Sequence, residues 1–199
     1  MKEHKISYRL IRAFFKYIYI GIYRPKLIDK ENIPKEGPVI LAGNHVTKID
    51  PCACLLATTR VVHFLAKDKY YDIFGVKQLF QLMNCIRVDS KGKNVDALSS
   101  AYEVLNNNGV IGIFPEGTRN LEKNGELLPF KYGTVKMASK CNATIVPFAI
   151  KVGSRFKTMR QTIIFGKPYK IKSDDLEKEN KILYNKIKTL LNREVIWNI

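Results

Sequence analysis

The chain of 199 residues contains only four cysteines, Cys52, Cys54, Cys85 and Cys141. Cys52 and Cys54 are separated by a single residue, and no histidine stands at zinc-finger spacing from either. The pattern therefore offers no set of metal ligands, and we expect no metal or other cofactor. We interpret the thiols as free and buried in a reducing cytosol. A catalytic cysteine is disfavoured, because no activating base stands near any of them in the sequence.

Long apolar runs are also missing. A helix that spans a bilayer needs about 20 apolar residues, and the stretch with few charges at residues 13–23 is shorter. Charged residues interrupt the N-terminal apolar stretch, so it does not have the pattern of a cleavable signal peptide. No repeats or low-complexity segments occur. The length, with 46% hydrophobic and 26% charged residues, predicts one globular domain with a substantial core.

Acidic residues are scarce, because 18 Asp and Glu stand against 34 Lys and Arg, giving a net charge of +16 and a pI of about 9.7. Such a balance favours an anionic partner, either a nucleic acid, a membrane surface or small anionic substrates. No helix-turn-helix pattern, aromatic ribonucleoprotein motif or metal finger is present. Only the net charge would support a nucleic-acid-binding module. A membrane or a phosphorylated substrate is therefore favoured, and no nucleic-acid partner is expected.

The N-terminal segment is both basic and apolar. Residues 2–26 hold seven Lys and Arg and one Glu, and Ile6, Leu10, Phe14 and Tyr17 follow helical spacing. We predict that residues 1–25 form an amphipathic helix that lies in the headgroup region of a membrane. The alternative is that the helix docks on the core of the domain formed by residues 26–199.

Strands are expected to alternate with helices in the rest of the chain, which predicts an α/β fold with a mainly parallel central sheet flanked by helices. The predicted strands are 26–31, 39–42, 61–66, 85–88, 110–114, 144–151 and 161–165, and the predicted helices are 51–58, 70–83, 96–105, 131–141 and 173–191.

The stretch from Ala42 to Pro51 places a histidine and an aspartate between a strand and a helix. Asp50-Pro51 is typical of a helix N-cap and a first helical position. A carboxylate five residues after a histidine can fold back and accept the ring N–H, which leaves the other ring nitrogen free as a base. The alternative is that Asp50 only caps its helix while His45 bonds the backbone.

A second stretch, Gly112 to Arg119, follows a predicted strand and brings a carboxylate, a glycine, a hydroxyl and a guanidinium into one loop. Together the two stretches resemble the lysophosphatidate acyltransferase (PlsC-like) family of glycerolipid acyltransferases. The resemblance runs in order from about residue 26 to about residue 170. It rests on Asn44-His45-x4-Asp50, Phe114-Pro115-Glu116-Gly117-Thr118-Arg119, Phe130-Lys131-x-Gly133, Ile145-Val146-Pro147-Phe148 and Ile33-Pro34-x3-Pro38.

The resemblance implies a glycerol-3-phosphate acyltransferase-like fold for residues 26–199 and an O-acyltransferase activity. A fatty acyl group would move from acyl-CoA or acyl-carrier protein to the 2-hydroxyl of 1-acyl-sn-glycerol 3-phosphate, giving phosphatidate. His45 would be the general base, worth about 10²–10⁴-fold in rate, and Asp50 its orienting partner. Backbone N–H groups near Glu116, Gly117 and Thr118 would stabilise the negative tetrahedral intermediate.

The same resemblance puts Glu116 beside the glycerol portion of the acceptor. Arg119 would hold the acceptor's phosphate through a charge-assisted, forked hydrogen bond. The alternative for Arg119 is a salt bridge with Glu116 or Glu122. Lys131 is a further candidate for contact with an anion.

One stretch, residues 84–91, departs from the family's pattern. The position usually held by glycine is Asn84, and the position of the arginine thought to help bind phosphate is Ser90. Arg87 stands three residues earlier, which puts it on the opposite face of a regular strand unless a bulge intervenes. Lys91 would reach the phosphate only as a point charge. We therefore expect phosphate binding to depend on Arg119 with a lysine helper, and acceptor selectivity to be looser than usual.

The expected partners are lysophosphatidate, the acyl donor and the anionic lipids at the cytoplasmic face of the cell membrane. Two alternatives stay open. The same machinery could acylate another lysolipid or glycerol 3-phosphate, or the chain could be a catalytically silent lipid-binding protein.

Overall fold

The computed structural model describes residues 4–89, 95–121, 126–152 and 160–194. The helices are α1 (Lys5–Tyr23), α2 (Pro51–Ala57), α3 (Val76–Leu82), α4 (Val95–Asn106), α5 (Gly133–Lys140) and α6 (Leu176–Asn192), with short 3₁₀ turns η1 (Lys30–Asn32) and η2 (Asp68–Tyr70). The strands are β1 (Lys26–Ile28), β2 (Val39–Gly43), β3 (Val62–Lys67), β4 (Ile86–Val88), β5 (Val110–Ile113), β6 (Thr144–Val152) and β7 (Gln161–Phe165).

The strands form one sheet in the order β1-β7-β6-β2-β5-β3-β4. Every neighbouring pair is parallel except β6 and β7, which run antiparallel. The central strand β2 lies between β5 and β6. All five of its residues are buried, as expected for a strand covered by helices on both faces. The predicted α/β fold with a mainly parallel sheet is therefore confirmed.

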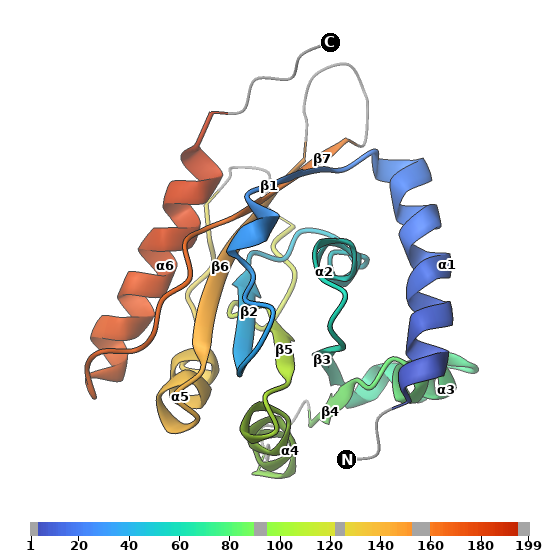
Figure 1. Cartoon of the computed structure of the whole chain (residues 1–199), viewed down its shortest axis with the longest axis horizontal. Helices are drawn as coiled ribbons and strands as arrows, with labels where there is room; N and C mark the ends of the chain where they lie inside the picture. The colour runs from blue at the N-terminus through green and yellow to red at the C-terminus, as the bar shows by residue number, and fades with distance from the viewer. Residues whose placement is uncertain (1–3, 90–94, 122–125, 153–159, 195–199) are drawn as a thin grey trace.

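Helices cover both faces of the sheet (Figure 1), and a separate hydrophobic core lies on each face. Side chains alternate along β2, so Val39 and Leu41 join the core under α1, α2 and α3, whereas Ile40 and Ala42 join the core under α4, α5 and α6. The α1 side holds the chain's N-terminal helix, and it is also the side on which the histidine loop after β2 folds.

Helix α1 docks on the domain with one side and exposes apolar residues on another. Tyr8 and Tyr19 are each 1% exposed and belong to the core. Ile6, Leu10, Phe14 and Tyr17, the residues that predicted the helix, are instead between 63% and 77% exposed. The alternative that the helix docks on its own domain is thus confirmed, and the helix also exposes an apolar face. Its location in the headgroup region of a membrane stays a prediction.

Two predicted elements were wrong in extent. The predicted strand 26–31 ends at Ile28, because Asp29 adopts a left-handed conformation with φ of 56° and the chain turns into η1. The predicted helix 70–83 begins only at Val76, because Gly75 at φ of 76° redirects the chain before the helix. A tight turn therefore precedes α3, and it leaves hydrophobic residues outside the core.

None of the helices in the described part of the chain is both long enough and apolar enough to cross a membrane.

The docking of α1 depends on polar contacts as well as on apolar ones. The Tyr19 hydroxyl donates to Oε1 of the buried Gln161 on β7. We predict that Tyr19→Phe lowers the free energy of unfolding by about 1–2 kcal/mol, because it leaves a buried acceptor without its donor. Urea denaturation measures the change. Tyr17→Phe, at a side chain that is 72% exposed, is the matched control and should be neutral; equal losses in both variants would contradict the argument.

Candidate active site

The two motif loops meet at the carboxyl ends of neighbouring parallel strands. The histidine loop follows β2 and the loop containing Glu116 follows β5, and these strands pair directly. Ligand sites in open α/β sheets lie at this end of the strands. The backbone N–H of Asn120 donates to the carbonyl of His45 at 2.7 Å, so the second loop is bonded directly to the first.

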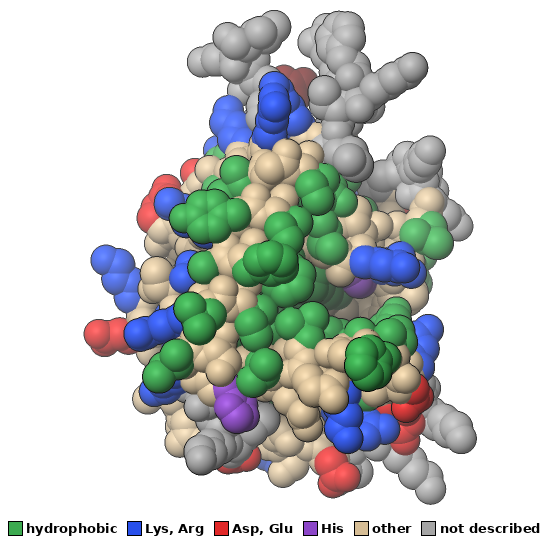
Figure 2. Space-filling view, turned by 90° about the vertical axis from the view of Figure 1, so that its right-hand side faces the viewer, with side chains coloured by type: hydrophobic (Ala, Val, Ile, Leu, Met, Phe, Trp, Pro, Cys, Tyr) green, Lys and Arg blue, Asp and Glu red, His purple; other side chains and the backbone are tan. Residues whose placement is uncertain are grey.

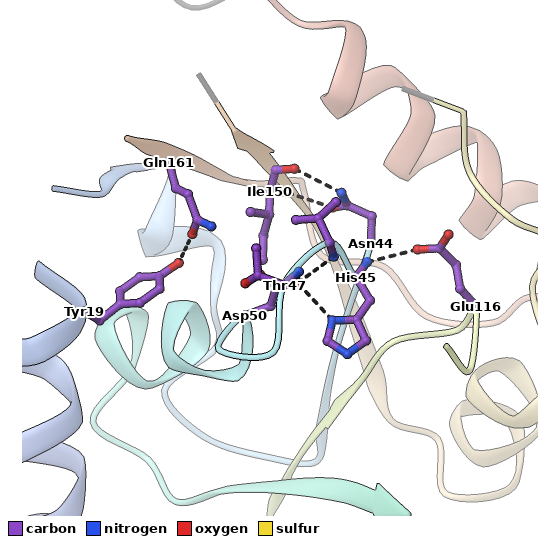
Figure 3. A network of polar contacts seen from close by, with 9 residues as sticks. Tyr19, Asn44, His45, Thr47, Asp50, Glu116, Ile150 and Gln161 are labelled. Carbon is purple, nitrogen blue, oxygen red and sulfur yellow. Dashed lines mark hydrogen bonds and ion pairs between the residues drawn. The ribbon is translucent and has the colours of Figure 1, made fainter. Parts of the chain in front are cut away.

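His45 and Asp50 form the pair that their spacing predicted (Figure 3). Nδ1 of His45 lies 2.9 Å from Oδ2 of Asp50. A carboxylate only accepts, so the proton sits on Nδ1 and the lone pair on Nε2 is available. The His45 side chain is 19% exposed while that of Asp50 is fully buried, so the imidazole is the reachable member of the pair.

The Asp50 carboxylate is surrounded by donors from its own loop. Oδ2 accepts the backbone N–H groups of Val46 at 2.6 Å and Thr47 at 2.8 Å, and Oδ1 accepts the Thr47 hydroxyl. It makes no capping bond to α2, so the alternative that Asp50 only caps its helix is wrong. A carboxylate bonded in this way fixes the loop and orients the imidazole together.

The imidazole is also held by an aromatic ring that the sequence analysis did not single out. The ring of Phe114 lies parallel to that of His45, with centroids 4.1 Å apart and an interplanar angle of 13°. Phe114 in turn contacts Phe64 and Phe148. The imidazole of His45 therefore packs against a cluster of aromatic side chains. On the α1 side of the molecule, Figure 2 shows a hollow bordered by hydrophobic side chains with a histidine at its back.

Glu116 braces the two loops and is 4% exposed. Oε1 accepts the backbone N–H of His45 and Oε2 accepts that of Leu128, each at 2.9 Å. Burial raises the pKa of this carboxyl above its ordinary value, although the two N–H groups and His45 partly oppose the rise. In this structure Glu116 holds the backbone of His45 from the opposite side to Asp50 (Figure 3).

Gly117 and Lys131 lie against each other. Gly117 has a φ of 68°, and a Cβ there would come within 2.8 Å of Lys131 Cε and 3.1 Å of Nζ. The backbone N–H of Lys131 donates to the carbonyl of Pro115 at 2.9 Å. The structure thus brings the exposed Lys131 to the second loop. The Gly117 N–H donates to the Phe114 carbonyl at 2.9 Å. The use of the N–H groups near Glu116, Gly117 and Thr118 for a tetrahedral intermediate stays a prediction.

Arg119 and Thr118 are the outer residues of this loop. Thr118 is exposed and Arg119 partly exposed. Within the described ranges no carboxylate pairs with the Arg119 guanidinium, and Glu116 bonds backbone groups instead, so the salt bridge to Glu116 is wrong. Glu122 lies outside the described residues. The role of Arg119 in binding phosphate stays a prediction.

The stretch that departs from the family's pattern is only partly described. Asn84 has a φ of 56°, a conformation that glycine adopts most easily and asparagine next. Its Oδ1 accepts the backbone N–H of His4 at 3.0 Å, which ties the start of α1 to this turn. Arg87 is exposed, with its guanidinium 5.4 Å from the centroid of the Tyr71 ring. Ser90 and Lys91 lie outside the described residues.

Asn44 is a second residue whose importance only the structure makes plain. Its side chain is buried, accepts the backbone N–H of Ile150 at 2.7 Å and donates to the Ile150 carbonyl at 3.0 Å. This paired contact extends the bonding between β2 and β6 by one residue beyond the strand. The sequence could have pointed to Asn44 through its position next to His45 in the motif. It could not have identified the partner Ile150, which lies far along the chain on β6.

The cysteines lie as follows. Cys52 and Cys54 are buried, Cys85 and Cys141 are partly buried, and all four are free. Burial, with Asp50 nearby, raises the pKa of Cys52 to about 12, so the thiol stays protonated at neutral pH and is a poor nucleophile. No cluster of three or more His, Cys, Asp or Glu suited to a metal ion occurs in the described ranges.

Comparison with known proteins agrees with this geometry. The family model for Acyltransferase matches residues 24–151, which is more than half of the chain and covers both motif loops. The chain therefore belongs to the acyltransferase family.

Two relatives and one solved structure show how far the likeness extends. A protein of Borreliella burgdorferi named 1-acyl-sn-glycerol-3-phosphate acyltransferase is 32% identical over 149 residues, which are 73% of this chain and 59% of the relative. A Bacillus subtilis protein of the same name is 25% identical over 148 residues, 72% of each chain. The chain thus spans less than two thirds of the Borreliella protein. The crystal structure of the Thermotoga maritima LPA acyltransferase PlsC shares the fold, with a TM-score of 0.71 at 20% identity over 98% of this chain and 86% of that one.

The raised pKa of Glu116 gives a pH-dependent prediction. The folded protein holds this proton more tightly than the unfolded chain, so the contribution of Glu116 to stability is greatest at acid pH and falls as the pH rises through the raised pKa. Glu116→Gln does not titrate. The unfolding free energy of the wild type minus that of Glu116→Gln should therefore fall as the pH rises above the ordinary range for glutamate. Urea denaturation at several pH values measures it, and a difference that grows with pH would contradict the assignment.

Proposed function

We propose that the chain is a membrane-associated 1-acylglycerol-3-phosphate O-acyltransferase. It would transfer a fatty acyl group from acyl-CoA or acyl-carrier protein to the 2-hydroxyl of 1-acyl-sn-glycerol 3-phosphate, making phosphatidate. The observation that carries the proposal is the reachable His45 imidazole, oriented by the buried Asp50 carboxylate at 2.9 Å. The names of the relatives point to the same acceptor.

In the proposed reaction Nε2 of His45 takes the proton of the acceptor's hydroxyl as its oxygen attacks the thioester carbonyl. The imidazolium that forms is stabilised by Asp50. The tetrahedral intermediate collapses by breaking the C–S bond, and the leaving thiolate takes the proton back from the imidazolium. A thioester is already activated, so the scheme needs no acyl-enzyme intermediate.

The negative tetrahedral oxygen requires hydrogen-bond donors in the second loop. Since the Gly117 N–H is engaged with Phe114, we assign this role to the neighbouring N–H of Thr118. Arg119 would bind the acceptor's phosphate with a bidentate fork, and Lys131 would add a second positive charge. Glu116 would act by holding the backbone of His45 rather than by contact with the glycerol portion alone.

Membrane association at the cytoplasmic face would bring the acceptor to this site. The α1 helix carries four basic and no acidic residues within Lys5–Tyr23 and exposes an apolar face. Such a helix binds an anionic surface through charge and through burial in the headgroup region.

The substrate assignment is tested by offering the purified protein several lysolipids and glycerol 3-phosphate, with acyl-CoA and with acyl-carrier protein as donors, and identifying the products by mass. Phosphatidate formed from lysophosphatidate is the expected product. If only another acceptor were acylated, that acceptor would replace lysophosphatidate as the assigned substrate. If no combination of acceptor and acyl donor gave a product, a catalytically silent lipid-binding protein would be favoured.

We predict that His45→Ala lowers turnover by about 10²–10⁴-fold while the protein stays folded, because the general base acts in the transition state. Asp50→Asn should lose less. The exposed His4 supplies a matched control, since His4→Ala should leave turnover unchanged. Initial rates and circular dichroism are the measurements. A His45→Ala enzyme that kept more than about a tenth of the rate would rule out the mechanism.

A further prediction separates the two candidate arginines. Arg119→Met should raise the apparent KM for lysophosphatidate by about tenfold or more, equivalent to about 1.4 kcal/mol, with a smaller change in kcat. Arg87→Met should have little effect on KM, because its guanidinium lies over Tyr71. Steady-state kinetics with lysophosphatidate decides between them. The reverse ranking would give Arg87 the role of the family's missing arginine.

A further inference from the structure

A hydrophobic turn stands outside the core between η2 and α3. Phe74 is fully exposed, with a relative exposure of 102%, and the preceding Ile73 is 52% exposed. A phenylalanine carries one of the largest apolar side chains, so leaving it in water forgoes a substantial gain from burial. Two neighbouring large apolar side chains exposed at one tip are a candidate contact with another apolar phase, especially beside the apolar face of α1.

Contacts at both ends of this turn fix its conformation. At its base the Tyr71 ring meets the Phe80 ring edge-on with centroids 5.4 Å apart, and it lies beneath the guanidinium of Arg87 at 5.4 Å. At its far end Gly75 adopts a φ of 76°, and its carbonyl accepts the Leu79 N–H at 3.1 Å. Contacts at both ends of the turn thus hold the tip in place, and the side chains of Ile73 and Phe74 are left exposed.

The turn lies on the same side of the molecule as the exposed face of α1. Helices α1 and α3 are in contact, and both lie at the same edge of the molecule in Figure 1. The bond from the His4 backbone to Asn84 connects the start of α1 to the end of the α3 segment. In Figure 2 hydrophobic side chains gather on this side of the molecule around the hollow that contains a histidine.

We propose that Ile73 and Phe74 insert into the lipid bilayer as a second apolar contact beside α1. The inference rests on the proposed function, because it takes the membrane as the partner of α1. Two contacts at separate points would fix the tilt of the protein, and the mouth of the hollow would face the lipid from which the acceptor comes. A protein partner seated on both contacts would cover that mouth, so lipid is the occupant assigned.

The two contacts should differ in their response to salt. The segment 68–77 carries Lys69 and Lys77 against Asp68 and Asp72, so it has no net charge and would insert through apolar burial alone. The α1 helix carries four basic residues and no acidic one, so its attraction to anionic lipid is screened by salt.

A single introduced tryptophan tests insertion directly. The chain has one tryptophan, Trp197, so Trp197→Phe gives a background in which Phe74→Trp, Phe14→Trp and Tyr132→Trp are each added alone. Tyr132 precedes α5 on the opposite face of the sheet and is 48% exposed. Vesicles of phosphatidylcholine and phosphatidylglycerol, with or without bromine on the acyl chains, are the probe. Emission from Phe74→Trp and Phe14→Trp should shift to the blue and be quenched by bromine, and that from Tyr132→Trp should not.

The outcomes separate the inference from the function on which it rests. Quenching in Phe14→Trp without quenching in Phe74→Trp would leave α1 as the membrane contact and overturn the inference. No quenching in either would overturn membrane association as well. A blue-shifted emission of Phe74→Trp without vesicles, together with a dimer in sedimentation, would mean that a second copy of the chain binds the turn. That result would also overturn the inference.

Affinity and activity give a second measurement. Phe74→Ser should weaken vesicle binding by about tenfold, as expected for losing one buried aromatic side chain, and by a similar factor at low and at high salt. Its rate with a lysolipid presented in detergent micelles should equal that of the wild type, and its rate with the same lysolipid in vesicles should fall. Tyr132→Ser is the matched control. An unchanged affinity for vesicles, or a loss seen only at low salt, would contradict apolar insertion of the turn.

Discussion

The Asp50 carboxylate is the group on which the arrangement of the site depends. It is buried, and a buried carboxylate is costly unless donors surround it. Here the donors are the imidazole of His45, the backbone of Val46 and Thr47, and the Thr47 hydroxyl. Because all four donors come from three consecutive residues of one loop, satisfying the charge also shapes the loop. The orientation of the base and the fold of the loop are therefore a single physical requirement.

The remaining contacts hold that loop in the sheet. Glu116 bonds the backbone of His45 from the β5 side, while Asn44 bonds Ile150 on the β6 side. Glu116 lies in the loop after β5 and Ile150 lies on β6, and these two strands flank β2. The loop is thus braced from both neighbouring strands, and Phe114 lies flat against the imidazole. A histidine held on this many sides would need little reorganisation to act as the proposed general base.

Helix α1 connects this site to the surface of the molecule. It lies against α2, the helix that follows Asp50, and the Arg12 side chain donates to the Leu55 carbonyl at 2.8 Å. Tyr19 lies in the same core and contacts Gln161 on β7. The helix that exposes apolar residues outward therefore also packs against the helix that follows the histidine loop.

The sequence by itself determined the order and type of most elements, the parallel sheet and the pairing of His45 with Asp50, because these depend on local periodicity and on groups a few residues apart. Tertiary structure decided the rest. The use of Glu116 as a brace, the stacking of Phe114 and the clasp of Asn44 join residues far apart along the chain, and no local pattern encodes them. The exposed turn at Phe74 was likewise decided by the tertiary structure: helical spacing predicted a helix over residues 70–83, whereas Gly75 redirects the chain and the helix begins only at Val76.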